Sequence, residues 1–414
     1  MFKYSREKFL SMSSNKLSRD LWLLIIFGAL RTVSDLFMGA FFISFVMHIS
    51  VNEIVSISTY KLFEYVATCA GFFLFAGWVK RHNKATVFGL SVLPKMAVLS
   101  AIIFLGADAV NYVVPLGLLY GLSAAMYYLP RHVITADKVS GKSMGHFVGT
   151  NNAIGYLAKI LAPVILGCFI DTGSYTDVAF ALLLLSCVEF GLSFMLTPSR
   201  HRDSRGTDFI GFYRCMRRFP VVRKLFLSEV LRGFGLGLLG TVITMYTVYI
   251  FHSDLNLGIL TTVFAICSVL TCWVFRYISR DKTIRILLQI CVFLVLLSML
   301  FFVWRATPVT FLIYNLVYAT AIIFIEQSSN ISMYKLSRSR CVTRDTCIEY
   351  FVLRDFALFL GRWVGFVGLI YVGVYGGYDW LRYYLILIGC VLVLWGWVCR
   401  TLFIPRQNSK NRHS

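Results

Sequence analysis

Charged residues are scarce in this sequence of 414 residues. They make up 14% of the chain, against roughly 25% in soluble domains, while hydrophobic residues reach 58% and mean hydropathy is +0.73. Acidic residues are the scarcer kind, 20 against 40 Lys and Arg, so the net charge is +20. The shortage of charge and the many long apolar runs exclude an ordinary soluble protein and indicate one that crosses the bilayer repeatedly.

Signals of metal binding and of ATP hydrolysis are also missing. The 11 Cys form no Cys-x-x-Cys pair and mostly lie inside apolar runs, and His shows no ligand spacing. We therefore expect buried free thiols and no metal site. The stretch "ADKVSGKS" has Ala136 where a P-loop needs Gly, and no strand pattern precedes it. No nucleophile–base pair stands out, so we expect no enzyme, no cofactor and no ATP-driven pump.

Twelve apolar runs are long enough to cross a bilayer, which takes about 20 residues per helix. The predicted spans are 21–47, 54–79, 85–107, 111–133, 146–170, 176–197, 224–251, 256–277, 285–304, 308–331, 347–373 and 380–403. The expected fold class is therefore an all-α membrane protein. The predicted order is a cytoplasmic N-terminal segment (1–20), a six-helix bundle (21–197), a basic cytoplasmic linker (198–223), a second six-helix bundle (224–403) and a cytoplasmic tail (404–414).

The positions of Lys and Arg predict the orientation. Thirty of the 40 lie in the two terminal segments and in alternate loops, and the other loops carry almost none apart from Arg305. Because positive loops stay in the cytoplasm, both termini are expected there, in a multi-pass protein of the cell membrane. These charges would face the anionic inner leaflet, so the net charge requires no nucleic acid partner.

The two halves of the sequence repeat weakly at a period of about 200 residues. When 146–160 is set over 349–363, Asn151 and Asn152 meet Arg354 and Asp355, and Lys159 meets Arg362. A second match, at nearly the same offset, sets Trp78 over Tyr277. Such a repeat indicates two pseudo-symmetric bundles.

Two six-helix halves with a basic turn after the second span resemble the major facilitator superfamily. The family's loop signature is Gly-x-Leu-x-Asp-Arg-x-Gly-Arg-Arg, and this sequence has "AGWVKRHNKA". Arg81 and Lys84 match its basic positions, whereas Lys80 replaces the Asp and Asn83 replaces the second Gly. The resemblance implies a central cavity lined by spans 1, 2, 4, 5, 7, 8, 10 and 11.

Many charges lie inside the predicted spans, where they usually mark a water-filled path. Three pairs have helical spacing that lets the side chains meet, namely Arg31–Asp35, Lys61–Glu64 and Glu229–Arg232. Four positions, Glu229 again among them, lie near cytoplasmic ends, where the side chain can reach the membrane–water interface: Arg131, Glu229, Glu349 and Glu326. Lys95 and Glu189 belong to spans outside the cavity-lining set, so we expect each to pair with a neighbouring helix.

Lys159 and Arg362 are the main candidates for binding a solute, because each lies midway along its span with no acid three or four positions away. Two interpretations remain open. Each cation pairs with an acid on a neighbouring helix, for instance Lys159 with Asp35 or Arg362 with Glu64, or the two cations bind an anion between them. The predicted substrate-binding residues are Lys159, Arg362, Asn151, Asn152, Arg354 and Arg31. The predicted ion-coupling residues are Asp35, Glu64, Glu326 and Asp355.

Together these features predict a secondary active transporter of a small polar solute, anionic or zwitterionic, that works by alternating access and couples to protons. One alternative is efflux of amphipathic drugs or lipids, which the intramembrane charges argue against. Another is a receptor or scaffold that keeps the fold without turnover, and a third is a membrane-embedded enzyme. The expected partners are a small-molecule substrate, protons and the lipid bilayer.

Overall fold

The computed structural model describes residues 18–81, 84–138, 142–197, 206–275, 281–337 and 346–403, and its regular elements are helices. The predicted N-terminal segment and tail therefore fall largely outside the described residues. The first half comprises α2 (Arg19–Leu36), η1 (Phe37–Phe41), α3 (Phe42–Ile49), α4 (Glu53–Arg81), α5 (Lys84–Leu90), α6 (Val92–Leu105), η2 (Gly106–Tyr112), α7 (Val113–Lys138), α8 (Lys142–Thr172) and α9 (Tyr175–Ser193). The second half comprises α10 (Phe209–Arg218), α11 (Pro220–Phe251), α12 (Asp254–Phe275), α13 (Asp281–Trp304), α14 (Pro308–Ser337), α15 (Cys347–Tyr375), α16 (Gly377–Arg400) and η4 (Thr401–Phe403).

Eleven segments of the described chain are long and apolar enough to cross a membrane. One of them, Lys84–Thr135, has 52 residues and contains α5, α6, the turn η2 and most of α7. Because α5 and α6 both pack against α7, this segment folds back on itself and makes two crossings. Gly106 begins the turn with a φ of 52°, a conformation that glycine adopts without steric penalty. The twelve predicted spans are therefore confirmed, and each overlaps its predicted range.

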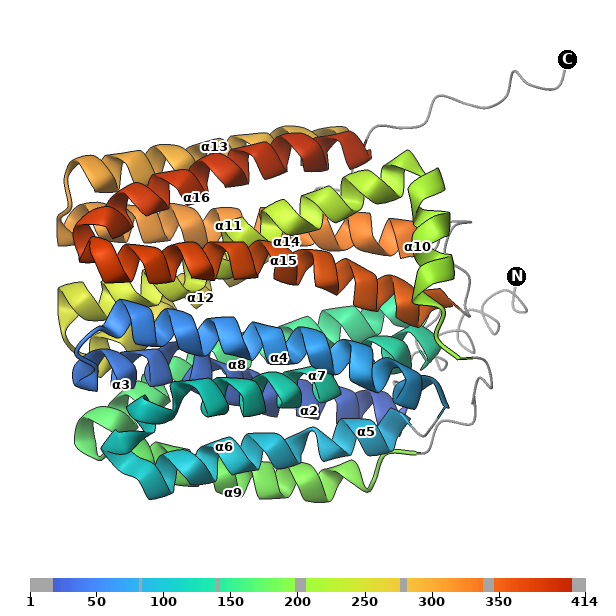
Figure 1. Cartoon of the computed structure of the whole chain (residues 1–414), viewed down its shortest axis with the longest axis horizontal. Coiled ribbons are helices and arrows are strands. Elements are labelled where there is room, and N and C mark those ends of the chain that lie inside the picture. The colour runs from blue at the N-terminus through green and yellow to red at the C-terminus, as the bar shows by residue number, and fades with distance from the viewer. Residues whose placement is uncertain are drawn as a thin grey trace, which may run out of the picture.

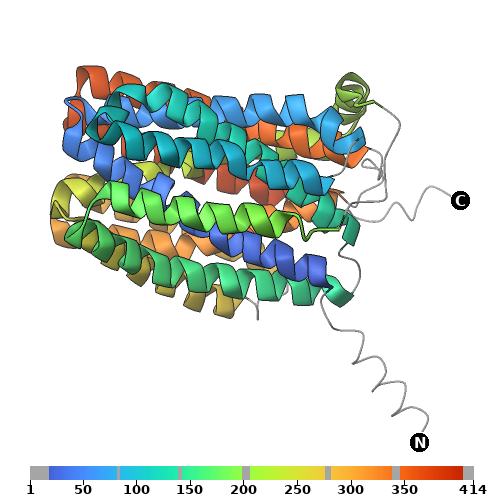
Figure 2. The same cartoon turned by 90° about the horizontal axis from the view of Figure 1, so that it is seen from below.

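The spans lie side by side in two bundles, α2 to α9 in the lower half of Figure 1 and α11 to α16 in the upper half. Helices α6 and α9 form one outer edge, and α13 and α16 form the other. The spans also run roughly parallel in the view turned by 90° (Figure 2). We call the end at which α4 finishes and α10 lies the basic end, because it carries Lys80 and Arg81 together with the Arg residues of α10.

Close glycine contacts bring α11 and α15 together in the second bundle. A side chain at Gly361 would collide with the backbone carbonyl of Val230, and one at Gly233 would collide with that of Leu358. The backbones can approach this closely only because both positions lack a Cβ atom. The Gly-x-x-x-Gly spacing visible in the sequence therefore builds the inner helix pair of this bundle.

The two bundles meet mainly through α4 against α15 and through α8 against α12. At the end opposite the basic end, Asn52 donates to the carbonyl of Gly373 at 3.4 Å. On the other interface, Thr262 donates to the carbonyl of Ile160 at 2.8 Å. The repeat relates these two contacts to each other, because spans 2 and 5 in the first half correspond to spans 8 and 11 in the second.

Two local features were not predicted from the sequence. The interval 198–223, expected as a plain linker, contains the ten-residue helix α10. The first span carries a π-helical segment, η1, which begins two residues after Asp35. Single π-helical turns inside longer helices often lie beside functional residues, and this one follows directly after a buried polar network.

Candidate functional site

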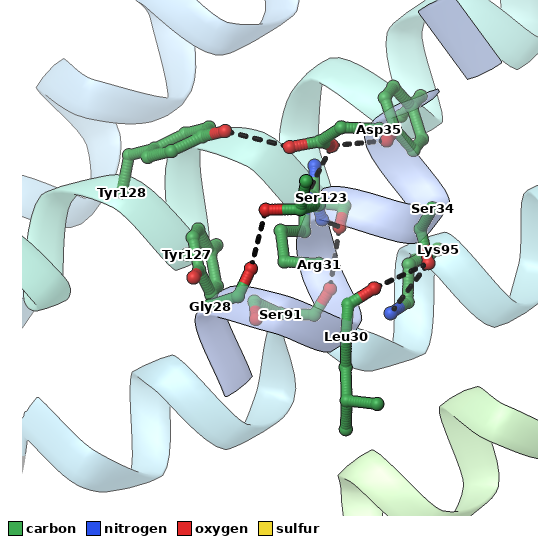
Figure 3. Close-up of polar contacts among 12 residues, drawn as sticks. Gly28, Leu30, Arg31, Ser34, Asp35, Ser91, Lys95, Ser123, Tyr127 and Tyr128 are labelled. Atoms are coloured by element: carbon green, nitrogen blue, oxygen red, sulfur yellow. Dashed lines mark hydrogen bonds and ion pairs between the residues drawn. The ribbon is translucent and has the colours of Figure 1, made fainter. Parts of the chain in front are cut away.

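Arg31 is the centre of a buried polar network in the first bundle (Figure 3). The residue is 2% exposed, its Nε donates to Asp35 at 2.8 Å, and its Nη1 donates to Ser123 at 2.7 Å. Asp35 also accepts hydrogen bonds from the hydroxyl groups of Tyr120 and Tyr128, the second at 2.8 Å. The predicted pairing of Arg31 with Asp35 is confirmed, and both groups are held in one geometry.

The partners of Arg31 come from one face of α7. Tyr120, Ser123, Tyr127 and Tyr128 recur at helical spacing, so they line a single stripe that faces α2. The Arg31 guanidinium lies 4.9 Å from the ring centre of Tyr120 and 5.3 Å from that of Tyr127. Aromatic faces attract a cation at this range, so the tyrosines stabilise the buried charge of Arg31.

A second acidic candidate lies on α4. Lys61 donates to Glu64 at 2.7 Å, as the i,i+3 spacing predicted, and both side chains are buried. The backbone carbonyl of Glu64 lies directly against Gly121 of α7, the residue after Tyr120, and this places the pair beside the Arg31 network. The structure therefore brings two of the four predicted ion-coupling carboxylates close together, Asp35 and Glu64.

The second bundle holds a comparable network around Glu229. Its carboxylate, which is 1% exposed, accepts from Arg232 at 2.6 Å and from Arg354 at 3.2 Å. Arg354 also donates to Asp355 at 2.8 Å, and Ser329 donates to Glu229 at 3.3 Å. Two carboxylates thus balance two guanidinium groups across α11, α14 and α15.

Arg362, the strongest candidate from the sequence, lies on the interface between the bundles. Its guanidinium stacks over the ring of Tyr65 on α4 at 4.3 Å. Asp355 lies two turns earlier in α15 and pairs with Arg354 instead. The alternative pairing of Arg362 with Glu64 is not found, because Glu64 accepts from Lys61.

Lys159 occupies the repeat-related interface, and its surroundings differ from those of Arg362. It is exposed, and its ammonium lies 5.8 Å from the ring centre of Tyr156 in the same helix. Glu326 of α14 is also exposed. The alternative pairing of Lys159 with Asp35 is not found, because Asp35 is paired with Arg31.

Asn151 is held by Arg131, whose side chain was expected to extend toward the membrane–water interface. Arg131 donates to the Asn151 side-chain oxygen and to the Tyr127 hydroxyl, each at 2.9 Å. The guanidinium is thereby kept between α7 and α8. The side chain of Asn152 lies outside the described residues.

Lys95 and Glu189 pair with each other on the outer edge of the first bundle. Their side chains are each 2% exposed and form an ion pair between α6 and α9, and Lys95 also donates to Ser34 at 3.5 Å. The expectation that each pairs with a neighbouring helix is confirmed. A buried pair is weak evidence for stability, because both charges lose their hydration.

This peripheral pair yields a stability prediction. Lys95→Met alone and Glu189→Leu alone should each destabilise the protein by about 3–5 kcal/mol, since each leaves one buried charge uncompensated. The double variant should recover most of the loss, because no charge then remains. Thermal unfolding followed by intrinsic fluorescence compares the stability of four purified proteins: the wild type, the two single variants and the double variant. A double variant no more stable than the single variants would contradict a purely structural role.

Lys80 and Glu349 form an ion pair between the bundles at the basic end, which we call the basic-end latch. Lys80 Nζ lies 2.8 Å from the Glu349 carboxylate, and both side chains are buried. The prediction that Glu349 and Glu229 extend to the membrane–water interface is therefore wrong. Lys80 and Arg354, which lie on other helices, hold the two carboxylates in the protein interior. Lys80 replaces the Asp of the family signature, so this latch carries a cation where the signature carries an acid.

Three intramembrane cations remain without a carboxylate partner among the described residues. The acids at Asp35, Glu64, Glu189, Glu229, Asp355 and Glu349 are each engaged by a Lys or Arg. For Arg131, Lys159 and Arg362 the described part of the chain provides only aromatic or amide contacts. Glu326 of α14 likewise has no cation partner in the described part of the chain, so three cations against this one acid leave a net excess of positive charge along the inner helices.

The tyrosine stripe of α7 was missed although the sequence carried a signal for it. Tyr120, Ser123, Tyr127 and Arg131 are three or four residues apart in an otherwise apolar span. Polar groups at that spacing lie on one helix face, so the stripe identifies which side of α7 faces other polar groups. Its partner, Arg31, could not be deduced because α2 is remote in the sequence.

Comparisons with known proteins agree with this architecture. The family model described as "Major Facilitator Superfamily" matches residues 21–340, well over half of the chain. No curated protein matches the sequence. The crystal structure of the human organic anion transporter MFSD10 (TETRAN) superimposes with a TM-score of 0.66 at 12% identity, covering 92% of this chain and 99% of that chain.

A second solved structure, a POT family transporter in complex with 5-aminolevulinic acid, has a TM-score of 0.69 at 10% identity. The match covers 92% of this chain and 95% of that chain. At such identities the two structures establish the shared fold. Together with the family match over 21–340, they show that this chain is an integral multi-pass membrane protein of the major facilitator superfamily.

Proposed function

We propose that the protein moves a small anionic or zwitterionic solute across the membrane by alternating access, driven by protons. The observation that carries the proposal is the imbalance of charge along the inner helices. Arg131, Lys159 and Arg362 lack a carboxylate among the described residues, whereas the buried acids are engaged. A solute with a carboxylate or phosphate would neutralise these cations, and Arg offers such groups two parallel hydrogen bonds.

Arg362 is the group we assign to the solute, with Lys159 as its repeat-related counterpart. Arg362 lies on α15 against α4, so a solute bound there would touch both bundles. Binding energy could then be used to draw the bundles together. The two structural neighbours, an organic anion transporter and a transporter in complex with an amino acid, are compatible with this solute class.

Contacts between the bundles at both ends support alternating access. At the basic end the latch joins Lys80 to Glu349. At the other end Asp254 of α12 accepts from the Tyr175 hydroxyl at 2.5 Å and lies 3.7 Å from His48 Nε2. Each set of contacts would have to break in turn for a central solute to reach one side and then the other.

Proton coupling is tested by removing one carboxyl charge at a time. In proteoliposomes, Asp355→Asn or Glu64→Gln should abolish uphill accumulation driven by a proton gradient, while exchange of solute across the membrane persists. The reason is that an amide cannot carry a proton between the two sides, but the binding groups remain. Asp35→Asn and Glu326→Gln are measured in the same way, so that each of the four candidate carboxylates is tested.

Asp379 provides the matched control. It is an exposed acid at the end of the molecule away from the latch and pairs loosely with Arg382 at 3.6 Å. Asp379→Asn should leave both accumulation and exchange unchanged. Uphill accumulation that survives in all four carboxyl variants would rule out proton coupling through these groups, and loss of exchange along with accumulation would indicate a damaged site instead.

A further inference from the structure

Helix α10 crosses the basic end where the two bundles meet. Figure 1 shows it lying across the spans, and Figure 2 shows it nearly end-on at the rim of the molecule. Phe209 packs edge-on against Phe73 of α4, with ring centroids 5.3 Å apart. Phe212 packs against Tyr350 of α15 at 6.3 Å. The inward face of α10 therefore touches one helix of each bundle.

Asp208 joins α10 to the basic-end latch. Its carboxylate accepts from the Gly211 N–H at 2.7 Å and so caps the first turn of the helix. Its own N–H donates to Glu349 at 3.3 Å, to the carboxylate oxygen that also accepts from Lys80 at 2.8 Å. A shift of α10 would therefore disturb the latch, and opening of the latch would release the start of α10.

The outward face of α10 combines apolar and basic side chains. Ile210 is 68% exposed and Tyr213 49% exposed, and Arg214 and Arg217 are exposed on the same stripe. Three further exposed cations follow at the end of α10 and the start of α11, namely Arg218, Arg223 and Lys224. The single acid between 206 and 224 is Asp208, which is engaged as the cap. The exposed face thus carries positive charge without an acid to offset it.

We propose that this face binds anionic phospholipid headgroups of the inner leaflet and thereby holds the basic end closed. An amphipathic helix that lies across the spans, with apolar and basic residues exposed side by side, has the pattern of a helix embedded in the interface. The Lys and Arg distribution assigns this end to the cytoplasm, where the leaflet is anionic. Lipid binding would fix α10, and α10 would hold α4 against α15.

Hydrogen exchange of the full-length protein in lipid nanodiscs tests this proposal. Discs of phosphatidylcholine are compared with discs in which phosphatidylglycerol is mixed in. Amides of 206–218 and 347–353 should exchange several-fold more slowly in the anionic discs, and raising the salt concentration should reduce the difference. The triple variant R214Q/R217Q/R218Q should exchange at the same rate in both kinds of disc.

Arg305 and Arg382 supply the matched control, because both lie at the opposite end of the molecule, where Arg305 is exposed and the Arg382 side chain is 41% exposed. The variant R305Q/R382Q should respond to lipid charge as the wild type does. Equal exchange in both discs for the wild type would overturn the proposal, as would a lipid response that survives in the triple variant. Slower exchange in α10 without any change at 347–353 would overturn the link to closure.

Discussion

Arg362→Gln is expected to weaken binding of an anionic solute by about tenfold to a hundredfold, because a charge-assisted hydrogen bond contributes about 1.5–3 kcal/mol. Lys159→Gln should have a smaller effect of the same sign, since Lys159 is exposed and its charge is better screened by water. The measurement is thermal stabilisation and equilibrium binding with pairs of probes, each a small carboxylic acid and its primary amide. The amide keeps the size of the acid and loses its charge.

The discriminating result is the ratio of the binding affinity for the acid to the binding affinity for its amide. If Arg362 binds the solute anion, Arg362→Gln should remove the preference for the acid and leave amide binding unchanged. Arg362→Lys should recover part of the preference, because it keeps the charge but loses the planar fork. Arg305→Gln, which removes an exposed charge at the far end, should change neither. An equal loss of acid and amide binding in Arg362→Gln would instead indicate that its stacking on Tyr65 supports the interface.

The spans and the local ion pairs were predictable because both depend on short-range patterns. A run of about 20 apolar residues must be a helix in lipid, since each backbone polar group needs a partner within the segment. The pairs Arg31–Asp35 and Lys61–Glu64 follow from helical spacing alone. The repeat likewise indicated two pseudo-symmetric bundles, but it did not specify which helices join them.

The remaining site depended on contacts between helices that are remote in sequence. Glu229 lies close enough to an end to reach water, but Arg354, 125 positions later, holds its carboxylate inside. Glu349 was misjudged for the same reason, because its partner Lys80 belongs to the other bundle. Burial of an acid is favourable only when a cation is supplied at close range, and a single sequence does not specify which helix supplies it.

Helix α10 was missed for a different reason. Ten residues with three cations and an acid nearby read as a hydrophilic connection, and such a segment is too short to be stable as a helix alone. Its two inward phenylalanines are stabilised by rings on α4 and α15, which are tertiary contacts. The segment therefore becomes recognisable as an element only after both bundles are in place.

Reversing the charge at either side of the basic-end latch should open that end of the transporter. Lys80→Glu would place two carboxylates where the structure has a buried ion pair, and loss of such a pair costs about 3–5 kcal/mol. A change of that size shifts a two-state equilibrium by more than a hundredfold. We therefore expect transport to fall steeply, since a transporter that cannot close on one side cannot complete its cycle.

The double reversal, Lys80→Glu with Glu349→Lys, separates the latch from general damage. It restores opposite charges across the bundles, so it should recover a substantial part of the transport rate. Recovery should be incomplete, because Glu349 also accepts from the Asp208 N–H and a lysine at that position cannot. Thiol labelling of His132→Cys, in a background lacking native Cys, reports whether the basic end is open. The ring of His132 stacks against that of Phe351 on α15, with ring centroids 5.4 Å apart. Labelling from the basic side should rise in each single reversal and decline in the double, and labelling that stays high in the double would mean that the pair does not close this end.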